Sequence, residues 1–346
     1  MFNKRFFLNS ILCLGCFIAI TCIFAAIGHA DEAEEITKLI EGAKREGMLT
    51  YYTSVNQSDA SLMIKKFEEK YPFIKVTMLR TTGERLFTRA LAEARAKKLP
   101  ADVYDSSIVQ VLQMKENGLL MKYTGPENKA FPAKFRDPEG FWNGTFHLPY
   151  VITYNTKTIP PKDAPKTYED LLNPKWRGKI GMDSDDIQWF FHLIKIMGRE
   201  KGIDYMRKLA KQNVTFRKGH TLLHTLCAAG EIPIVVVGYL SGVQLIKDKG
   251  APIDWVRFES FPTITAIHSV AVVASAPHPH AAKLLYNFIL SRDGARVFRE
   301  VKRIPARPDE QPPEVKGIDY YVAYPGELMA NYKQVAKEWE EIFFHK

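Results

Sequence analysis

Hydrophobic positions in the first third of the chain alternate between helical and strand spacing. After Asp31, apolar residues at Ile36, Leu39 and Ile40 follow the spacing of an amphipathic helix, which Gly47 ends. Strand and helix patterns then alternate with short connections, which predicts an α/β domain with a largely parallel sheet. The expected elements are the strand MLTYYTSV, a helix from Asp59, the strand FIKVTML, the helix LFTRALAEARAKK, the short strand ADVYDSS and the helix IVQVLQMKENG.

The middle of the chain changes character and predicts a passage into a second domain. Residues 122–143 are rich in proline, glycine, lysine and phenylalanine without a clear period, and the apolar strand FHLPYVITYNTKT follows. The near-continuous apolar run IPIVVVGYL is typical of a strand buried in a parallel sheet. The remaining expected elements are the helices IQWFFHLIKIMG, GIDYMRKLAKQ and HTLLHTLCAAG, the strand TAIHSVAVVAS, the amphipathic helix HAAKLLYNFILSRDGARVFREV and the final helix GELMANYKQVAKEWEEIFFHK.

The first thirty residues have the pattern of a secretory signal. Two basic residues precede a long apolar run, and small residues at the end of the run suit cleavage after Ala30. We therefore expect residues 1–30 to be a cleaved signal peptide and the mature protein to be periplasmic. An uncleaved anchor and a lipoprotein remain open, the latter because Cys16 and Cys22 lie in this run. No later segment has the ~20 apolar residues that span a bilayer.

Composition narrows the class of protein. Hydrophobic residues make up 46% of the chain and charged residues 25%, which is the balance of a soluble globular protein. The formal net charge is +9, but the basic residues are dispersed, so we expect no nucleic-acid partner. Outside the signal the sequence has a single cysteine, Cys227, which excludes an internal disulfide. Its apolar neighbours at helical spacing predict a core position.

The sequence lacks the common catalytic motifs. It has no GxSxG, GxxxxGK[ST], HExxH or CxxC segment, and its carboxylates are too scattered to indicate an acid–base pair. His278 and His280 flank a proline in a way that fits a surface turn better than a metal site. His220 and His224 share a helical face, but two histidines do not complete a metal site. We predict no catalytic residue, no metal ligand and no cofactor.

Nine segments, taken in order, resemble those of periplasmic substrate-binding proteins of ABC transporters, in the branch that includes the ferric-ion-binding proteins. The resemblance covers nearly all of residues 45–308 and is carried by the ordered set rather than by one diagnostic motif. The segments are TYYTSVN, PADVYDSS, NGLLMKY, VITYNTKT, NPKWRGKIGM, AAGEIPIVV, KDKGAPIDWV, APHPHAAKLLYNFILSRDGARVF and RIPARP.

This resemblance implies a two-lobed periplasmic binding protein fold of type II, with two crossing strands as the hinge. Ligand would bind in the cleft between lobes that close by hinge motion, and the closed form would dock on a membrane permease. The chain would then divide into a signal peptide over 1–30, lobe 1 over 31–148 with 264–305, lobe 2 over 149–263, and a C-terminal helical segment over 306–346.

The iron ligands of the ferric-ion-binding branch do not carry over position by position. The family has a histidine after the first strand, where this chain has Asn56, and a glutamate where this chain has Ser106 and Ser107. It has adjacent tyrosines after the GE turn, where this chain offers only Tyr239. Ferric iron prefers anionic oxygen ligands. The comparison therefore implies a ligand other than free Fe(III), and iron or a metal complex held by a shifted ligand set remains the alternative.

The expected ligand site lies at strand carboxyl ends and helix amino ends, where such folds bind ligands. The residues at those places are largely hydroxylic and aromatic, which suits a polar organic molecule with an apolar face. Each of them could instead cap a helix or form a turn. The predicted ligand-binding residues are Ser54, Asn56, Ser106, Ser107, Tyr150, Asp183, Asp186, His220 and Tyr239.

The segment DSDD in front of IQWFFHLIKIMG bears on the charge of the ligand. The resemblance places it where anion-binding members have a small turn whose N–H groups hold the anion at a helix terminus. Here carboxylates are expected to occupy those donors and to repel a second anion. The segment favours a cationic or neutral organic ligand or a metal complex over phosphate, although Arg217 and Lys218 leave an organic acid open. The aromatic residues behind it, Trp189, Phe190 and Phe191, are expected to be mostly core.

We therefore predict an exported solute-binding protein that captures a small solute and delivers it to the permease of an ABC importer in the inner membrane. We expect a monomer. An exported enzyme or sensor built on the same two-lobed fold remains the alternative from another class.

Overall fold

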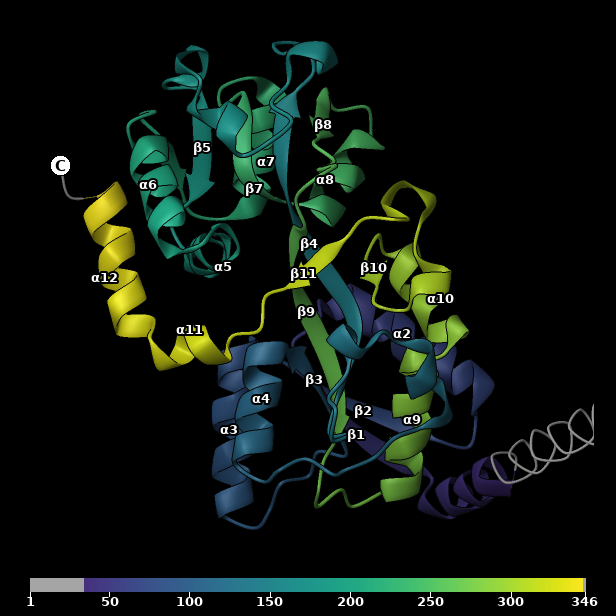
Figure 1. The fold of residues 1–346 in the computed structure, drawn as a ribbon. Helices are drawn as coiled ribbons and strands as arrows, with labels where there is room; N and C mark the ends of the chain where they lie inside the picture. The colour runs from purple at the N-terminus through teal and green to yellow at the C-terminus, as the bar shows by residue number, and fades with distance from the viewer. Residues whose placement is uncertain (1–33, 345–346) are drawn as a thin grey trace, which may run out of the picture.

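The computed structural model describes residues 34–344, which form two α/β lobes joined by two long strands (Figure 1). The strands are β4 (Asn143–Asn155) and β9 (Thr263–Val272), which pair antiparallel and continue from one lobe into the other. The predicted α/β class with two crossing strands is confirmed. The expected signal peptide over 1–30 lies outside the described residues. Among residues 34–344, no helix has the length and hydropathy that crossing a bilayer requires.

Lobe 1 is built on a mixed sheet covered by helices. β1 is parallel to both of its neighbours, β2 and β3, while β3 pairs antiparallel with β9. The chain is helical over residues 34–46 before β1. The other elements of this lobe are β1 (Met48–Thr53), α2 (Gln57–Lys70), β2 (Lys75–Arg80), α3 (Gly83–Arg95), β3 (Val103–Ser107), α4 (Ile108–Glu116), α9 (Pro279–Leu290), α10 (Arg292–Glu300) and β10 (Ile304–Pro305).

Lobe 2 continues the same strand path beyond β4. β7 is antiparallel to β4 and parallel to β5, and β5 is parallel to β6, so the full path reads β2-β1-β3-β9-β4-β7-β5-β6. β8 pairs with the second half of β4. The elements of this lobe are β5 (Ile180–Asp183), α5 (Ile187–Met197), α6 (Arg199–Ala210), β6 (Thr215–Arg217), α7 (His220–Ala229), β7 (Ile234–Tyr239), α8 (Leu240–Lys247) and β8 (Ile253–Trp255).

Two helices predicted as continuous are interrupted in the structure. The backbone of Ser291 is extended, and its side chain accepts the N–H of Gly294, so α9 ends and α10 begins there. Asn331 separates α11 (Gly326–Ala330) from α12 (Tyr332–Phe343), and its side chain donates to the carbonyl of Glu327. Such side chains compete with helical backbone bonds. Short 3-10 helices occupy connections: η1 (Pro126–Ala130), η2 (Ala133–Phe135), η3 (Pro161–Asp163), η4 (Glu169–Leu172), η5 (Pro174–Trp176), η6 (Pro308–Glu310) and η7 (Pro313–Val315).

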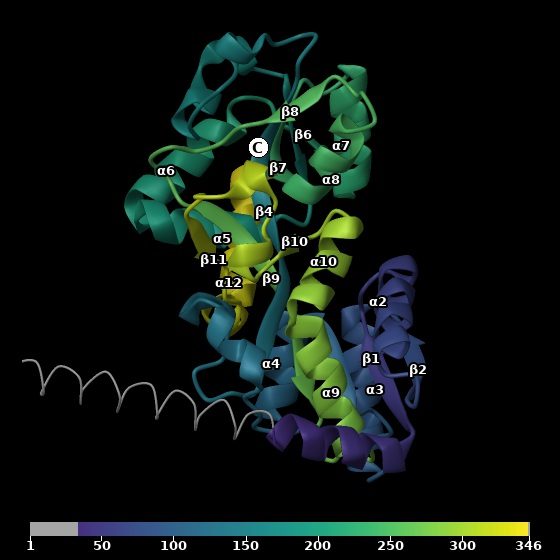
Figure 2. The same cartoon turned by 90° about the vertical axis from the view of Figure 1, so that its right-hand side faces the viewer.

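The C-terminal segment does not stand apart from the lobes. β10 pairs with β4, and β11 (Tyr320–Val322) pairs with the lobe 2 end of β9. α12 then packs along α5 and α6 on the outside of lobe 2 (Figures 1 and 2). The aromatic side chain of Trp339 fills this contact, with ring centroids 5.3 Å from Phe190 and 5.9 Å from Phe216.

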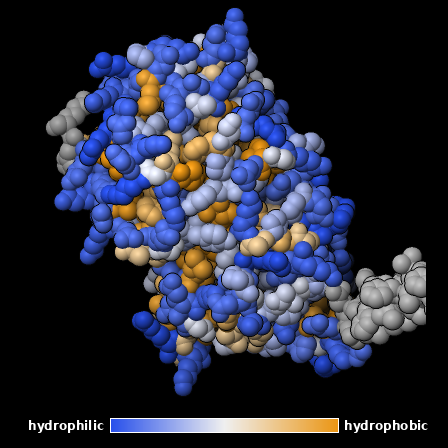
Figure 3. All heavy atoms as spheres, viewed as in Figure 1, coloured by the Kyte–Doolittle hydropathy of each residue, from blue (hydrophilic) through white to orange (hydrophobic). Residues whose placement is uncertain are grey.

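Two large apolar clusters mark the two lobes. One combines residues 39–146 with 267–298 and a few later positions, and the other combines residues 150–264 with the C-terminal helices. Figure 3 shows a waist between the lobes. The division of cores falls inside β4 and β9, near the boundaries expected at 148–149 and 263–264, which we retain as a proposal. The hinge strands thus contribute residues to both cores and connect the two lobes.

Replacing Trp339 by alanine should lower the free energy of unfolding by about 3–5 kcal/mol, the usual cost of deleting a buried aromatic side chain. The side chain is almost fully buried between α12 and α5. Urea unfolding would measure the loss if it is followed by far-ultraviolet circular dichroism, whose backbone signal does not rely on the deleted tryptophan. Lys337→Ala on the exposed face of the same helix is the control and should change little. A loss below about 1 kcal/mol for Trp339→Ala would mean that α12 is not part of the lobe 2 core.

Candidate functional site

The predicted site residues lie where strands of the two lobes end facing one another. In lobe 1 they follow β1 or end β3, and in lobe 2 they end β5 and β7 or lie at the amino ends of α5 and α7; the arrow of β5 points toward the lower lobe in Figure 1. Tyr150 lies on the hinge strand β4 itself. Parallel strands with helices between them collect their connections at one edge, so the fold itself gathers these positions.

In lobe 2, Asp183, Asp186 and His220 form a contact cluster. Asp183 accepts the backbone N–H of Gly219 through Oδ2 at 2.6 Å and that of Asp185 through Oδ1 at 2.9 Å. Asp186 Oδ2 accepts the N–H of Asp183 at 3.1 Å, and Asp186 Oδ1 lies 3.4 Å from His220 Nε2. Backbone N–H groups of two loops therefore hold both buried carboxylates in place.

The prediction that these carboxylates cap the helix behind them is wrong. Asp186 is the N-cap residue of α5, but its side chain accepts no N–H from the first turn of that helix. Its Oδ2 is turned back to the N–H of Asp183 and closes the loop instead. The negative charge of the loop is therefore directed toward His220 and the space beside it, not into the helix.

The contact between Asp186 and His220 depends on their protonation. His220 Nδ1 lies 3.0 Å from the carbonyl oxygen of Val237, which can only accept, so Nδ1 carries a hydrogen. In a neutral imidazole, Nε2 would then present a lone pair to Asp186 Oδ1. A proton on either group relieves that repulsion.

Burial shifts both groups toward their uncharged forms. Burial first, and the charge of Asp183 second, raise the pKa of the Asp186 carboxyl well above its usual value. Burial lowers the pKa of His220, with Asp183 acting in the opposite direction. The ionised form of Asp186 is therefore unfavourable in the unliganded protein, and a positive charge beside it would stabilise that form.

Two tyrosines stack against this cluster. The rings of Tyr150 and Tyr239 are stacked with centroids 5.6 Å apart, and the ring of Tyr239 lies 4.0 Å from that of His220. Burial raises the pKa of both phenols, and the charge of Asp186 contributes to each shift. The Tyr150 hydroxyl donates to Gln188 Oε1 at 3.2 Å. The lobe 2 wall is thus acidic and aromatic.

In lobe 1, a second cluster joins Ser54 and Ser106 to the hinge. Their Oγ atoms are 3.0 Å apart, and Ser54 Oγ is 3.1 Å from His268 Nε2. His268 Nδ1 is 2.8 Å from Oδ1 of the fully buried Asp105, although the two atoms are not aligned for a hydrogen bond, so their contact is electrostatic. The Tyr51 hydroxyl donates to the other oxygen of Asp105.

The two remaining predicted residues of lobe 1 lie outside this network. Asn56 is exposed and precedes α2 without a side-chain cap. The Ser107 hydroxyl donates to Gln110 Oε1 within the first turn of α4. Of the nine predicted residues, the structure therefore brings together two in lobe 1 and five in lobe 2.

The two clusters open onto one face of the hinge. Phe146 on β4 pairs with His268 on β9, and their rings stack at 4.6 Å. Because strand side chains alternate, Leu148 and Tyr150 lie on the same face as Phe146, while His147 lies on the other. Phe146 and Tyr150 are four residues apart, about 13 Å along the strand. This face forms a floor between the clusters.

The sequence reasoning missed His268 and Gln188. Gln188 Nε2 donates to the carbonyl of Ala323 at 3.1 Å, which links Tyr150 to the C-terminal segment. Its position on a largely apolar helix gave no signal of that role. His268 had one, because it is a titratable residue inside the otherwise apolar crossing strand TAIHSVAVVAS.

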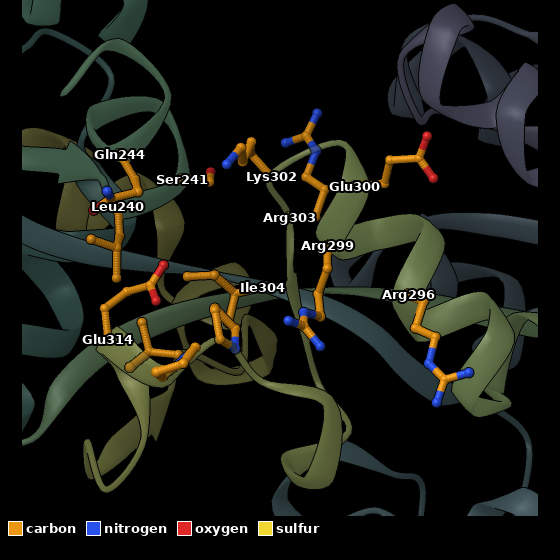
Figure 4. Close-up of a pocket in the computed structure, with 13 residues that line it drawn as sticks. Leu240, Ser241, Gln244, Arg296, Arg299, Glu300, Lys302, Arg303, Ile304 and Glu314 are labelled. Carbon is orange, nitrogen blue, oxygen red and sulfur yellow. The ribbon is translucent and has the colours of Figure 1, made fainter. Parts of the chain in front are cut away.

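A cavity of about 460 Å³ lies beside the hinge, between α8 of lobe 2 and α10 of lobe 1 (Figures 2 and 4). Leu240 and Ile304 contribute apolar surface, and four cationic side chains of lobe 1 surround it. Lys302 Nζ bonds to Asp248 Oδ2 at 2.8 Å across the lobes. These four side chains are each paired with a carboxylate, so the cavity does not carry a free positive charge: Arg296, Arg299, Lys302 and Arg303.

Two further histidines, His278 and His280, and the cysteine have structural surroundings. His278 and His280 contact the carboxylates of Asp102 and Glu46 at 3.0 and 2.7 Å at the start of α9. Cys227 is buried, as predicted. Trp189 and Phe190 are buried and Phe191 is half-buried, also as predicted. Within residues 34–344, no three His, Cys, Asp or Glu side chains are grouped as a metal ion would require.

Comparison with known proteins identifies the family of this chain. The family model described as bacterial extracellular solute-binding protein matches residues 101–323. The chain belongs to this family. Iron uptake protein A2 of Synechocystis is 30% identical over 66% of this chain and 70% of that protein. The fold is that of type II periplasmic binding proteins, as the sequence resemblance implied.

Two solved structures show how ligands differ among proteins of this fold. Trichodesmium IdiA (FutA), in complex with iron and citrate, superposes with a TM-score of 0.72 at 21% identity, covering 86% of this chain and 99% of that one. AfuA from Actinobacillus pleuropneumoniae, with exogenous fructose-6-phosphate bound, gives a TM-score of 0.67 at 23% identity, covering 86% and 98%. The fold alone therefore does not select the ligand.

Asp186→Asn should stabilise the unliganded protein by about 0.5–2 kcal/mol at neutral pH, as removal of a strained functional charge often does. A raised pKa means that the folded state holds a proton the unfolded state has lost, so this carboxyl destabilises the fold increasingly as pH rises. The advantage of the variant should therefore grow from about pH 4 to about pH 8. Thermal unfolding across that range would measure it.

Asp185→Asn is the matched control, because its carboxylate is exposed and contacts only Lys218 at 3.1 Å across the surface. It should shift the melting temperature little at any pH. If Asp186→Asn destabilised the protein at high pH, Asp186 would not be the strained group.

Proposed function

We propose that this protein is the periplasmic solute-binding component of an ABC importer and that it binds a cationic solute between its lobes. The observation that carries the proposal is the buried cluster of Asp183, Asp186 and His220 against the stacked pair Tyr150 and Tyr239. The signal-like pattern of residues 1–30 supports export, and membership of a family of solute-binding proteins supports delivery to an inner-membrane permease.

A cation relieves the strain that the lobe 2 wall carries. With a positive group beside Asp186, the carboxyl can release its proton and form an ion pair shielded from water. Aromatic faces attract organic cations as well, and Tyr150 and Tyr239 supply two of them. A phosphate-like anion would meet Asp183 and Asp186 instead, which is unfavourable.

Ferric iron is the second candidate, favoured by the pairing of Tyr150 with Tyr239 next to Asp186. The sequence reasoning against iron counted Tyr239 alone, and the hinge strand adds a second phenol to the set. Two phenolates and a carboxylate are hard anionic donors of the kind Fe(III) prefers. The names of the Synechocystis and Trichodesmium proteins point in the same direction.

Mass spectrometry of ligand retained through native purification would identify the solute directly. Thermal shift against amines, neutral solutes, organic acids and ferric citrate tests the class, because a ligand that binds only the folded state raises its melting temperature. Stabilisation by amines supports the main proposal. Stabilisation only by neutral solutes or acids would contradict it, and consumption of a substrate would point to the enzyme alternative.

Binding of a cation should release a proton and tighten as pH rises. Asp186 must ionise to pair with the ligand, and its raised pKa means that protonation competes with binding at acid pH. Titration calorimetry in buffers of different ionisation enthalpy would count the protons. Asp186→Asn should weaken the cation about tenfold or more and abolish the pH dependence, whereas Asp185→Asn should retain both. An unchanged affinity in Asp186→Asn would remove the loop from the site.

Tyr239→Phe separates the two candidates. If Fe(III) binds, the wild-type protein should show a visible phenolate-to-iron absorption band that the variant loses together with most of its affinity, because a hard anionic ligand is gone. An organic cation should lose only a few-fold in affinity, since the phenylalanine ring still offers an aromatic face. No visible band with ferric citrate would exclude phenolate-bound iron.

A further inference from the structure

The two walls of the cleft differ in charge. The lobe 2 wall carries Asp183, Asp185 and Asp186 in one loop. In lobe 1, Asp105 directly precedes Ser106 and is fully buried, and its two carboxylate oxygens contact the Tyr51 hydroxyl and the His268 ring. At this place the lobe 1 wall therefore has a pair of hydroxyl groups, where the lobe 2 wall has three carboxylates in one loop.

Arg80 adds a positive charge to the same wall. It ends β2, next to β1, and its Nε donates to the carbonyl of Val55 at 3.0 Å in the loop that holds Ser54. Its side chain is exposed, and no carboxylate of residues 34–344 forms an ion pair with it. Asp59, in the first turn of α2, is already paired with Arg303 at 3.2 Å. The terminal nitrogens of Arg80 are thus available for an anionic group.

The backbone of Gly83 packs closely against the serine hydroxyls. Gly83 begins α3, and a Cβ added to it would lie 3.0 Å from Ser106 Oγ and 2.9 Å from Gln110 Oε1. A side chain at this position would crowd the hydroxyl pair. The exposed Glu84 follows it in the same turn.

The spacing of the two walls sets the size of a ligand that reaches both. The hinge residues below the two clusters, Phe146 and Tyr150, are about 13 Å apart along β4. Side chains from both walls extend into that span, so opposite charges separated by several bonds fit it better than the adjacent charges of glycine.

We propose that the ligand is a zwitterion whose two charged groups are separated by several bonds. Its anionic group, a carboxylate, binds lobe 1 at Arg80, Ser54 and Ser106, while its cationic group binds lobe 2 at Asp183 and Asp186. The inference rests on the proposed function, because the cationic end occupies the site argued there. A ligand held at both ends also explains how closure would be driven, since each lobe binds one end.

Three probes of one chain length test the proposal: 5-aminopentanoate, pentylamine and pentanoate. 5-Aminopentanoate should bind about tenfold or more tightly than pentylamine, because only it engages both walls. Arg80→Gln should remove that advantage and leave pentylamine unchanged, while Asp186→Asn should weaken both amines. Lys75→Gln, at the other end of the same strand, is the matched control and should behave as wild type. Calorimetry gives the affinities, and melting temperatures confirm that each variant folds.

The outcomes distinguish the two proposals. Equal binding of the two amines, unaffected by Arg80→Gln, would overturn the anionic subsite and leave the cationic solute intact. Binding of pentanoate alone would overturn both. Absence of binding by all three up to about 10 mM, well above the range of a specific site, would overturn a zwitterion of this length.

Discussion

The antiparallel pairing of β4 with β9 fixes the relation between the two lobes and the chemistry between them. The register sets Phe146 opposite His268 and turns both toward the cleft, while His147 faces the other way against Tyr320. A slip of one residue would exchange the two faces. It would turn Tyr150 to the face that His147 now occupies. His147, whose pKa burial lowers to about 3, would then lie on the face that Tyr150 occupies. The site therefore depends on this register more than on any single loop.

Lobe 2 stores unfavourable electrostatics at the place where a ligand would bind. Two buried aspartates share a loop, and burial raises the pKa of one of them, Asp186, beside a histidine whose own pKa burial lowers. A fold selected only for stability would replace one of these carboxylates by a neutral group. Functional sites are where such strain is expected, since a partner of opposite charge can relieve it. Tyr239 and Tyr150 belong to the same wall, so the strained carboxylates and the aromatic rings would contact the same group of a ligand.

The alternation of strands and helices was predictable because periodicity reports burial on one face or both. Interruptions at Ser291 and Asn331 were not, because a single side chain bonding to the backbone decides them. Positions of site residues at strand ends were also predictable from fold and order. Their partners were not: Tyr150 meets Tyr239 only because β4 pairs with β7, a contact across 89 residues of sequence that no local pattern contains. The expectation against iron rested on neighbours in sequence, and topology supplied a different neighbour.

The C-terminal segment links the hinge to the site chemistry. β11 pairs with β9 at the lobe 2 end, and the carbonyl of Ala323 just beyond it accepts from Gln188, which in turn accepts the Tyr150 hydroxyl. The next residue, Tyr324, donates to the carbonyl of Lys134 in lobe 1 at 2.6 Å. A rotation of the lobes would strain the bond of Tyr324 to lobe 1 or the bonds that join Ala323 to Gln188 and Tyr150, and a change in the latter would alter the hydrogen bonding of Tyr150. Binding of a ligand at Tyr150 would in this way be coupled to the rotation of the lobes about the hinge.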